Sequence, residues 1–162
     1  MTTTYWRNRM LKVAFFVGTT EFYIGLTCTL PKEDGTGVSE PLGNGYARVK
    51  IHEFTSPEYG EVHNPETINF PISTGVWFTT DMPATHWCLF DGPGSTAKLL
   101  TCGPLTYPIA VRQNVLVRFP AGMVSIKLED DTVNVQNVLQ DEDNVVVLNA
   151  GIGVTNILGD EE

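Results

Sequence analysis

The sequence predicts a mainly β protein: an antiparallel, jelly-roll-like β-sandwich with one N-terminal helix and a β-prone, acidic C-terminal extension. Between Thr85 and Glu129, short runs of β-branched and aromatic residues alternate with turns that contain Gly and Pro. Turn residues at such regular spacing are typical of sandwiches and barrels. A helical apolar pattern precedes residue 18, and a surplus of acidic residues follows residue 128. These three observations define the fold class that we expect.

The chain of 162 residues is long enough for one domain with extensions, and 42% hydrophobic residues suffice for a substantial core. No apolar run has the length that spans a bilayer, and no secretory signal pattern is present, so we expect no membrane partner. Three cysteines, an odd number, do not make a disulfide framework. Reduced thiols in a protein made in the cytoplasm are therefore expected.

The formal net charge of −9 is concentrated near the C-terminus. Residues 1–128 contain ten Lys/Arg and ten Asp/Glu, whereas residues 129–162 contain nine Asp/Glu and no Lys/Arg. We therefore divide the chain into a neutral body, 1–128, and an acidic arm, 129–162. Neither part offers the basic footprint of a nucleic-acid-binding protein. The arm is either solvated or meets a basic partner, with Asp141, Glu142 and Asp143 as its contact candidates.

A helix is predicted for Tyr5–Val17, capped by a hydroxyl of Thr2–Thr4 and ended by Gly18. Its apolar stripe recurs at helical spacing, at Trp6, Met10, Val13, Ala14 and Val17. The opposite face is basic and holds the contact candidates Arg7, Arg9 and Lys12. The simpler interpretation is a helix packed on its own sandwich. The alternative is a basic helix that anchors a partner.

Alternating or β-branched segments predict four strands in the first half of the body: Glu21–Leu30, Tyr46–Phe54, Thr67–Phe70 and Val76–Thr80. Two polar segments rich in turn residues, Lys32–Gly45 and Ser56–Pro65, are predicted as surface loops. Glu40, Asp81 and Asp91 lie near loops and are expected to be solvated carboxylates.

The second half of the body predicts four more strands: His86–Phe90, Lys98–Cys102 (interrupted by Gly103-Pro104), Asn114–Phe119 and Val124–Leu128. If the first hairpin centres on Ser95, Cys88 and Cys102 face each other across adjacent strands. A disulfide there is possible only with specific geometry, and two reduced core thiols are the simpler expectation.

After a charged break at Glu129–Asp131, the arm contains β-prone runs at Val133–Leu139 and Asn144–Leu148, which Gln140–Asp143 separates, and a possible third run at Ile152–Leu158. A wholly disordered tail would contain fewer Val, Leu and Ile residues. These runs are able to pair with an edge of the chain's own sheet or with an edge of a neighbouring subunit. The sequence leaves both open.

No catalytic, cofactor-binding or metal site is predicted. The three histidines lack close ligand spacing, and the chain has no Cys-x-x-Cys motif, nucleophile elbow, phosphate loop or dinucleotide fingerprint. Trp77, Trp87 and Tyr107 could line a sugar-binding surface, although aromatic residues in short strands are more often core or interface anchors.

Six motifs in order resemble a family of tailed-bacteriophage structural proteins known as phage tail fiber proteins. They are the strand Phe22–Leu30, Glu40 before Gly43-Asn44-Gly45-Tyr46-Ala47-Arg48-Val49, Ile68-Asn69-Phe70-Pro71, Trp77 followed by Thr85-His86-Trp87-Cys88-Leu89-Phe90-Asp91, Gly103-Pro104-Leu105-Thr106, and Val117-Arg118-Phe119-Pro120-Ala121-Gly122. The similarity covers roughly residues 5–128, and residues 129–162 fall outside it.

The resemblance implies a non-enzymatic structural protein of a phage virion that forms homo-oligomers. Our first expectation is a decoration or cement protein on the capsid surface, bound to the major capsid protein or to other virion proteins. The alternative is a tail-fibre or baseplate-associated protein for host attachment. A carbohydrate-binding module is the third interpretation. Neither a nucleic acid nor a membrane is expected as a partner.

Overall fold

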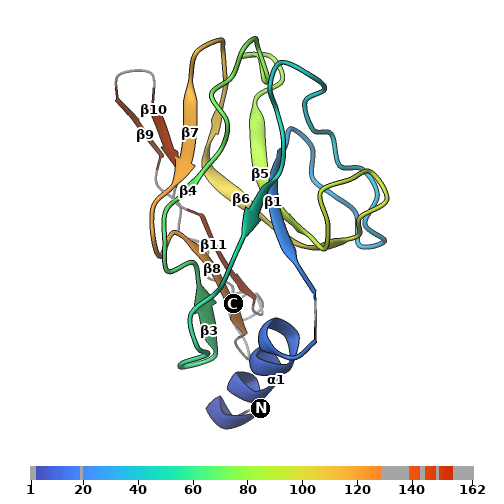
Figure 1. Ribbon diagram of the computed structural model, residues 1–162, viewed down its shortest axis with the longest axis vertical. Coiled ribbons are helices and arrows are strands. Elements are labelled where there is room, and N and C mark those ends of the chain that lie inside the picture. The colour runs from blue at the N-terminus through green and yellow to red at the C-terminus, as the bar shows by residue number, and fades with distance from the viewer. Residues whose placement is uncertain (1–2, 19, 129–138, 143–144, 149, 155–162) are drawn as a thin grey trace, which may run out of the picture.

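The computed structural model describes residues 3–18, 20–128, 139–142, 145–148 and 150–154, the last three ranges by their backbone. These residues form one helix and eleven strands (Figure 1). The elements are α1 Thr4–Phe16, β1 Phe22–Thr27, β2 Val49–Ile51, β3 Glu61–His63, β4 Ile68–Asn69, β5 Ala84–Phe90, β6 Leu99–Ile109, β7 Leu116–Phe119, β8 Val124–Leu128, β9 Leu139–Glu142, β10 Val145–Leu148 and β11 Ala150–Val154.

The strands form three sheets, in the orders β2-β1-β5-β6, β4-β7-β10-β9 and β11-β8-β3. Within the body, every strand pair is antiparallel. The inward side chains of the first sheet, such as Ile24 and Leu89, share one core with Val117 and Phe119 of β7, and all four are buried. The prediction of a mainly β, antiparallel fold with one N-terminal helix is confirmed.

The strands of the C-terminal extension join the body in parallel. Val146 of β10 pairs with Val117 of β7, and Ile152 of β11 pairs with Ile126 of β8. Of the two edges that the sequence left open, the described strands therefore use those of the chain's own sheets. The predicted run before Leu139 and the residues after Val154 lie outside the described residues.

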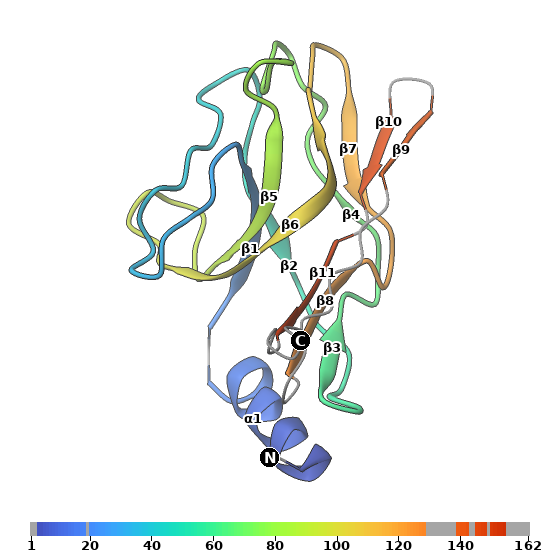
Figure 2. The same ribbon diagram turned by 180° about the vertical axis from the view of Figure 1, so that it is seen from behind.

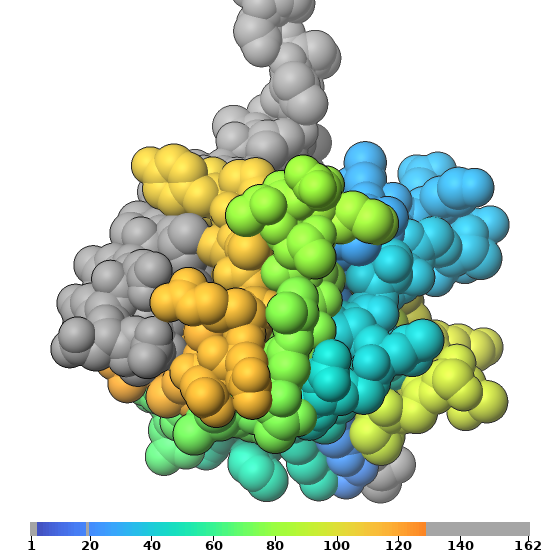
Figure 3. Space-filling view, turned by 90° about the horizontal axis from the view of Figure 1, so that it is seen from above, coloured from blue at the N-terminus to red at the C-terminus, as the bar shows by residue number. Residues whose placement is uncertain are grey.

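Helix α1 and the β9–β10 hairpin occupy different ends of the molecule. Viewed with the longest axis vertical, α1 lies at the bottom and the hairpin lies in the upper half, and the view from behind agrees (Figures 1 and 2). The upper end also holds loops from three parts of the chain. Figure 3 looks down on these loops, where the cyan segment around residue 45, the green segment around residue 75 and the orange segment around residue 113 lie side by side.

Four of the strands predicted for the body are present with shorter bounds (β1, β2, β4 and β7), β5 and β6 are longer, and β8 has the predicted bounds. The turn centred on Ser95 places Cys88 directly opposite Cys102, as predicted. Both cysteines are free thiols, and so is Cys28. The predicted break at Gly103-Pro104 is wrong, because β6 continues through it. β6 ends its sheet, and a strand at an edge tolerates the missing N–H of a proline.

Three further expectations need correction. The predicted strand Val76–Thr80 is reduced to a single bridge between Phe78 and Val111, because the partner segment turns away directly after it. The predicted loop Ser56–Pro65 contains β3, whose three residues pair with β8. The segment Gln140–Asp143, expected to separate two β-prone runs, is instead part of strand β9 up to Glu142 and pairs with β10, while Asp143 lies outside the described residues.

Candidate partner-binding surface on helix α1

Helix α1 is anchored by one buried face. The Thr3 hydroxyl oxygen accepts a hydrogen bond from the Trp6 backbone N–H at 3.2 Å, which caps the helix at the position the sequence predicts. Leu11 is 2% exposed. The Phe15 ring lies 5.0 Å from the Phe22 ring and 4.7 Å from the Phe54 ring, centroid to centroid. The helix therefore packs on the body, which is the simpler of the two interpretations above.

Arg7 and Asn8 join this anchored face to the turn before β3. The Gly60 backbone N–H donates to the Asn8 Oδ1 at 2.7 Å, and Gly60 has a φ of +76°. A Cβ atom on Gly60 would lie 3.0 Å from the Arg7 Nε and 2.8 Å from the Leu128 carbonyl oxygen. Glycine is therefore required for this close approach. Arg7, one of the three predicted contact cations, lies against the body.

The predicted apolar stripe of α1 does not face the body. Trp6 is 50% exposed and Val17 63%, and Met10 and Val13 are exposed as well. Tyr5 and Phe16 add two exposed aromatic side chains to the same outward half of the helix. The expectation that this stripe is the packing face is therefore wrong. The outward half of α1 presents apolar surface to solvent, which is typical of an interaction site.

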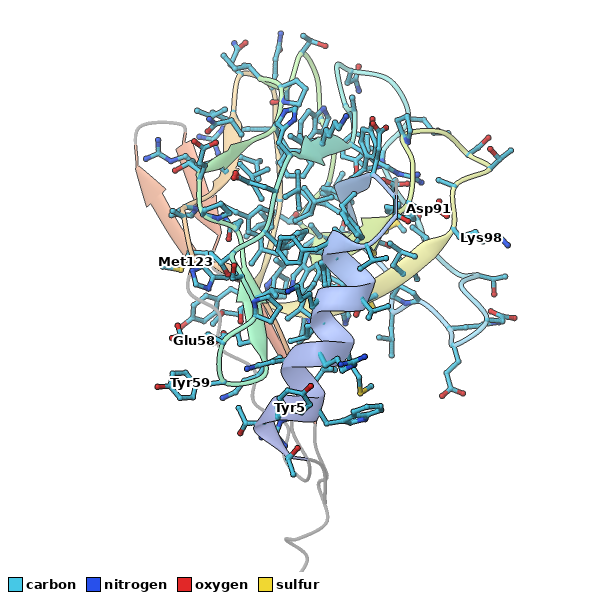
Figure 4. The ribbon with its side chains drawn as sticks, turned by 60° about the horizontal axis from the view of Figure 1, so that its bottom comes forward. Tyr5, Glu58, Tyr59, Asp91, Lys98 and Met123 are labelled. Atoms are coloured by element: carbon cyan, nitrogen blue, oxygen red, sulfur yellow. The ribbon has the colours of Figure 1, made fainter. Side chains whose placement is uncertain are left out.

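A groove runs between α1 and the segment before β3. It has a volume of about 330 Å³ and is lined by Tyr5, Asn8, Arg9, Lys12, Ser56 and Pro57. Arg9 Nη1 donates to the Tyr5 hydroxyl at 3.3 Å. Figure 4 looks onto this end of the molecule, where Tyr5 lies on α1 and Glu58 and Tyr59 project from the neighbouring turn. Two of the three predicted contact cations, Arg9 and Lys12, thus line one groove together.

The charge of α1 is of one sign. Its thirteen residues include Arg7, Arg9 and Lys12 and no Asp or Glu. None of the residues that line the groove is acidic, although the exposed Glu58 follows Pro57 directly. The predicted acidic contacts are not near α1: Asp141 and Glu142 belong to β9, in the upper half of the molecule (Figure 1). The structure therefore separates Asp141 and Glu142 from the predicted contact cations of α1, while Asp143 lies outside the described residues.

The aromatic residues considered for sugar binding do not form a platform. Trp87 is 0% exposed and Trp77 is also buried, so neither ring face is open to a ligand. The Trp77 indole N–H donates to the Asn44 carbonyl oxygen at 2.8 Å. Tyr107 is exposed on β6. The sugar-binding interpretation therefore loses the stacking surface on which it was based.

The upper end of the molecule, where the loops around residues 45, 75 and 113 meet, carries exposed apolar residues that the sequence analysis did not single out. Leu42 is 94% exposed, and Ile72 and Val76 are also exposed. Asn44, with a φ of 55°, holds these loops together: its carbonyl oxygen accepts from the Thr74 backbone N–H, and its Nδ2 donates to the Val76 carbonyl oxygen. The Gly43-Asn44-Gly45 turn was visible in the sequence. Its contact with a segment some 30 residues later was not.

Across the ranges that the structure describes, no three His, Cys, Asp or Glu side chains are placed to hold a metal ion. In the same ranges, no helix has the length and apolar character needed to cross a membrane. Among the described residues, the outward half of α1 with its groove combines exposed apolar side chains with charge of a single sign.

Comparison with known proteins identifies one family. The sequence profile of the podophage GP4 fiber I protein gp80 family matches residues 1–127. No curated protein and no solved structure matches the chain. The match covers α1 and all strands from β1 to β7, together with most of β8. The resemblance to phage tail fiber proteins is thereby confirmed, and the chain belongs to the podophage GP4 fiber I protein gp80 family.

Proposed function

We propose that the protein is a non-enzymatic structural subunit of a phage tail fibre. The observation that supports this most strongly is the family match over residues 1–127, because the family is named for a virion fibre. Membership implies that the protein is part of the virion and associates with other virion components. The tail-fibre interpretation, the alternative in the sequence analysis, thus has better support than capsid decoration. Capsid decoration remains a prediction that no observation supports.

The contact with the virion is proposed to involve the outward half of α1. Arg9 and Lys12 line its groove and supply positive charge, and the exposed Trp6 and Val13 supply apolar area. Aromatic and arginine side chains are enriched at the energetically important centres of interfaces. Arg7 is proposed to act indirectly, since it lies against Gly60 and positions the helix. On the extension, Asp141, Glu142 and Asp143 remain proposed contacts for a basic partner.

The test is localisation of the protein on intact particles by gold labelling and electron microscopy. The proposal expects label at the tail fibres. Label spread evenly over the icosahedral shell would instead establish a decoration protein. Particles without any label would remove a virion role and reduce the family match to a statement about the fold.

A further inference from the structure

We infer that α1 of one copy packs lengthwise against α1 of a second copy through an exposed apolar seam. The seam consists of Trp6, Met10, Val13 and Val17. The inference rests on the proposed function, because it names a partner for the α1 surface within the virion. It commits to another copy of this chain as the occupant of that surface.

α1 carries apolar residues on two sides. Leu11 and Phe15 hold the inner side on the body, where Leu11 is buried and the Phe15 ring packs on two other rings. The four seam residues lie on the outer side and are between 44% and 63% exposed. A helix that only covers its own domain needs one apolar stripe, whereas apolar residues all round are typical of a helix that is covered on every side. The described body covers only the inner side of α1.

The spacing of the seam favours another helix as its occupant. Its residues are four, three and four positions apart. Apolar residues at alternating intervals of three and four form one line along a helix, which is the pattern through which two helices pack side by side. Trp6, Met10 and Val13 lie within α1, and Val17 is its C-cap residue. In the part of the chain that the structure describes, α1 is the only helix, so a second copy supplies the matching seam.

The seam itself contains no charged residue. Arg7 lies against Gly60 of the body, and Arg9 and Lys12 line the groove on one flank of the seam. In a parallel pair, the flank with Arg9 meets the opposite flank of the second helix, which holds the small, uncharged Ala14. The pairing therefore does not place the cations of the two copies directly against each other, which would oppose association.

The exposed apolar area of α1 is sufficient for such a contact. Together with Tyr5 and Phe16 at its rim, the seam exposes about 700 Å². Each partner of a standard interface contributes about 800 Å². Because both copies use the same patch, the contact is isologous and two copies cover each other's seam. α1 lies at the lower end of the long axis in both views, where a second copy can approach it (Figures 1 and 2).

The first experiment changes the seam in the full chain. Met10→Glu/Val13→Glu places two carboxylates in the seam, at positions that are exposed in the monomer. The matched control is Leu42→Glu/Ile72→Glu, which makes the same kind of change at exposed apolar residues of the upper loops. Association is measured by analytical ultracentrifugation over a concentration series at low and at high salt. Circular dichroism verifies that each variant is folded.

The wild type is expected to form dimers that high salt does not weaken, because salt screens charges and not apolar contacts. The seam variant is expected to raise the dissociation constant at least about tenfold, since pairing would bury carboxylates without partners. The control variant is expected to associate like the wild type.

The second experiment tests the contact directly. Met10→Cys is treated with a short bismaleimide, which joins two thiols only when they lie close together. Leu42→Cys is the control, because Leu42 is more exposed than Met10 but lies outside the seam. The wild type, with its three native cysteines, gives the background. A covalent dimer is expected from Met10→Cys well above both.

Other outcomes overturn the inference. A wild type that stays monomeric at every concentration would do so, as would a seam variant that associates normally, dimers that high salt dissolves, or equal cross-linking of Met10→Cys and Leu42→Cys. If particles carry the label at their fibres while the purified protein is monomeric, the proposed function stands and the inference fails. Seam-dependent dimers of a protein that is absent from particles would remove the proposed function and keep the contact.

Discussion

The guanidinium group of Arg48 forms a nearly buried ion pair with the carboxylate of Glu40, with 2.6 Å between Nη2 and Oε2. The Arg48 Nε also donates to both carboxylate oxygens at 3.1 Å. Its Nη1 donates to the carbonyl oxygens of Gly92 and Gly94, and its guanidinium lies 3.5 Å from the centre of the Phe90 ring. One side chain thus ties the long loop before β2 to the turn between β5 and β6.

Arg48→Met is predicted to destabilise the fold strongly. The substitution leaves the Glu40 carboxylate without its cation in a site where the two side chains are only 11% (Arg48) and 16% (Glu40) exposed. Removing one partner of such a pair costs about 3 kcal/mol or more, because the remaining charge is poorly solvated. Urea denaturation measures the effect. Lys98→Met, at an exposed site, is the control, and equal unfolding midpoints for the two variants would refute the prediction.

Gly25→Ala is predicted to separate Glu40 from β1. A Cβ atom on Gly25 would lie 2.5 Å from the Glu40 Oε1 and 2.8 Å from the Tyr46 hydroxyl oxygen, which are joined by a 2.7 Å hydrogen bond. Overpacking of this kind costs roughly 1–3 kcal/mol. Gly94→Ala is the matched control, since a Cβ atom there meets no atom within 4 Å. Thermal unfolding of both variants tests this prediction. A midpoint temperature of Gly25→Ala as high as that of Gly94→Ala would contradict it.

Trp87→Ala and Trp6→Ala are predicted to differ sharply in their effect on the free energy of unfolding. Trp87 is 0% exposed and packs against Gly103, so its loss leaves a cavity that costs about 3–5 kcal/mol. Trp6 is half exposed on α1, and its loss should cost less than about 1 kcal/mol in the monomer. Guanidinium unfolding curves provide the comparison. Similar midpoints for the two variants would show that α1 is not oriented as described.

Stability is predicted to fall at alkaline pH. Burial raises the pKa of the Cys88 thiol, with a smaller contribution from Cys102, and burial also raises the pKa of Cys102 itself. Because the folded state holds these protons more tightly, the stabilisation is complete below the unfolded thiol pKa of about 8.5 and is lost above it. The slope approaches at most about 1.4 kcal/mol per pH unit for the Cys88 thiol, and the half-buried Cys102 adds to it in the same direction.

The measurement is urea unfolding under reducing conditions between about pH 8 and pH 10. The Cys88→Ala/Cys102→Ala variant is the control and should lose less stability over this interval. Tyr46 contributes in the same direction at higher pH, since burial and the nearby Glu40 raise its pKa. Identical slopes for the variant and the wild type below pH 10 would mean that the thiols are not the cause.

Local patterns were sufficient to predict the positions of most elements. Helix α1, the strands β5, β7 and β8, and the opposition of Cys88 and Cys102 follow from spacing and turn residues alone. The reason is that strand alternation, capping and tight turns depend on residues a few positions apart. The charge division between the body and the extension is likewise a property of the sequence by itself.

Packing between distant segments decided the rest. The sequence of α1 has apolar residues on two faces, so its periodicity did not specify which face is buried. The contacts of Phe15 with Phe22 and Phe54 determine the buried face. Glu40 looked like a solvated loop carboxylate, and only the folded chain brings Arg48 to it, with the Arg48 guanidinium also held by the Gly92 carbonyl oxygen. The sequence by itself therefore determined the class of fold and the location of charge. The tertiary structure decided which apolar and charged side chains are left for a partner, because burial depends on neighbours that no local pattern reveals.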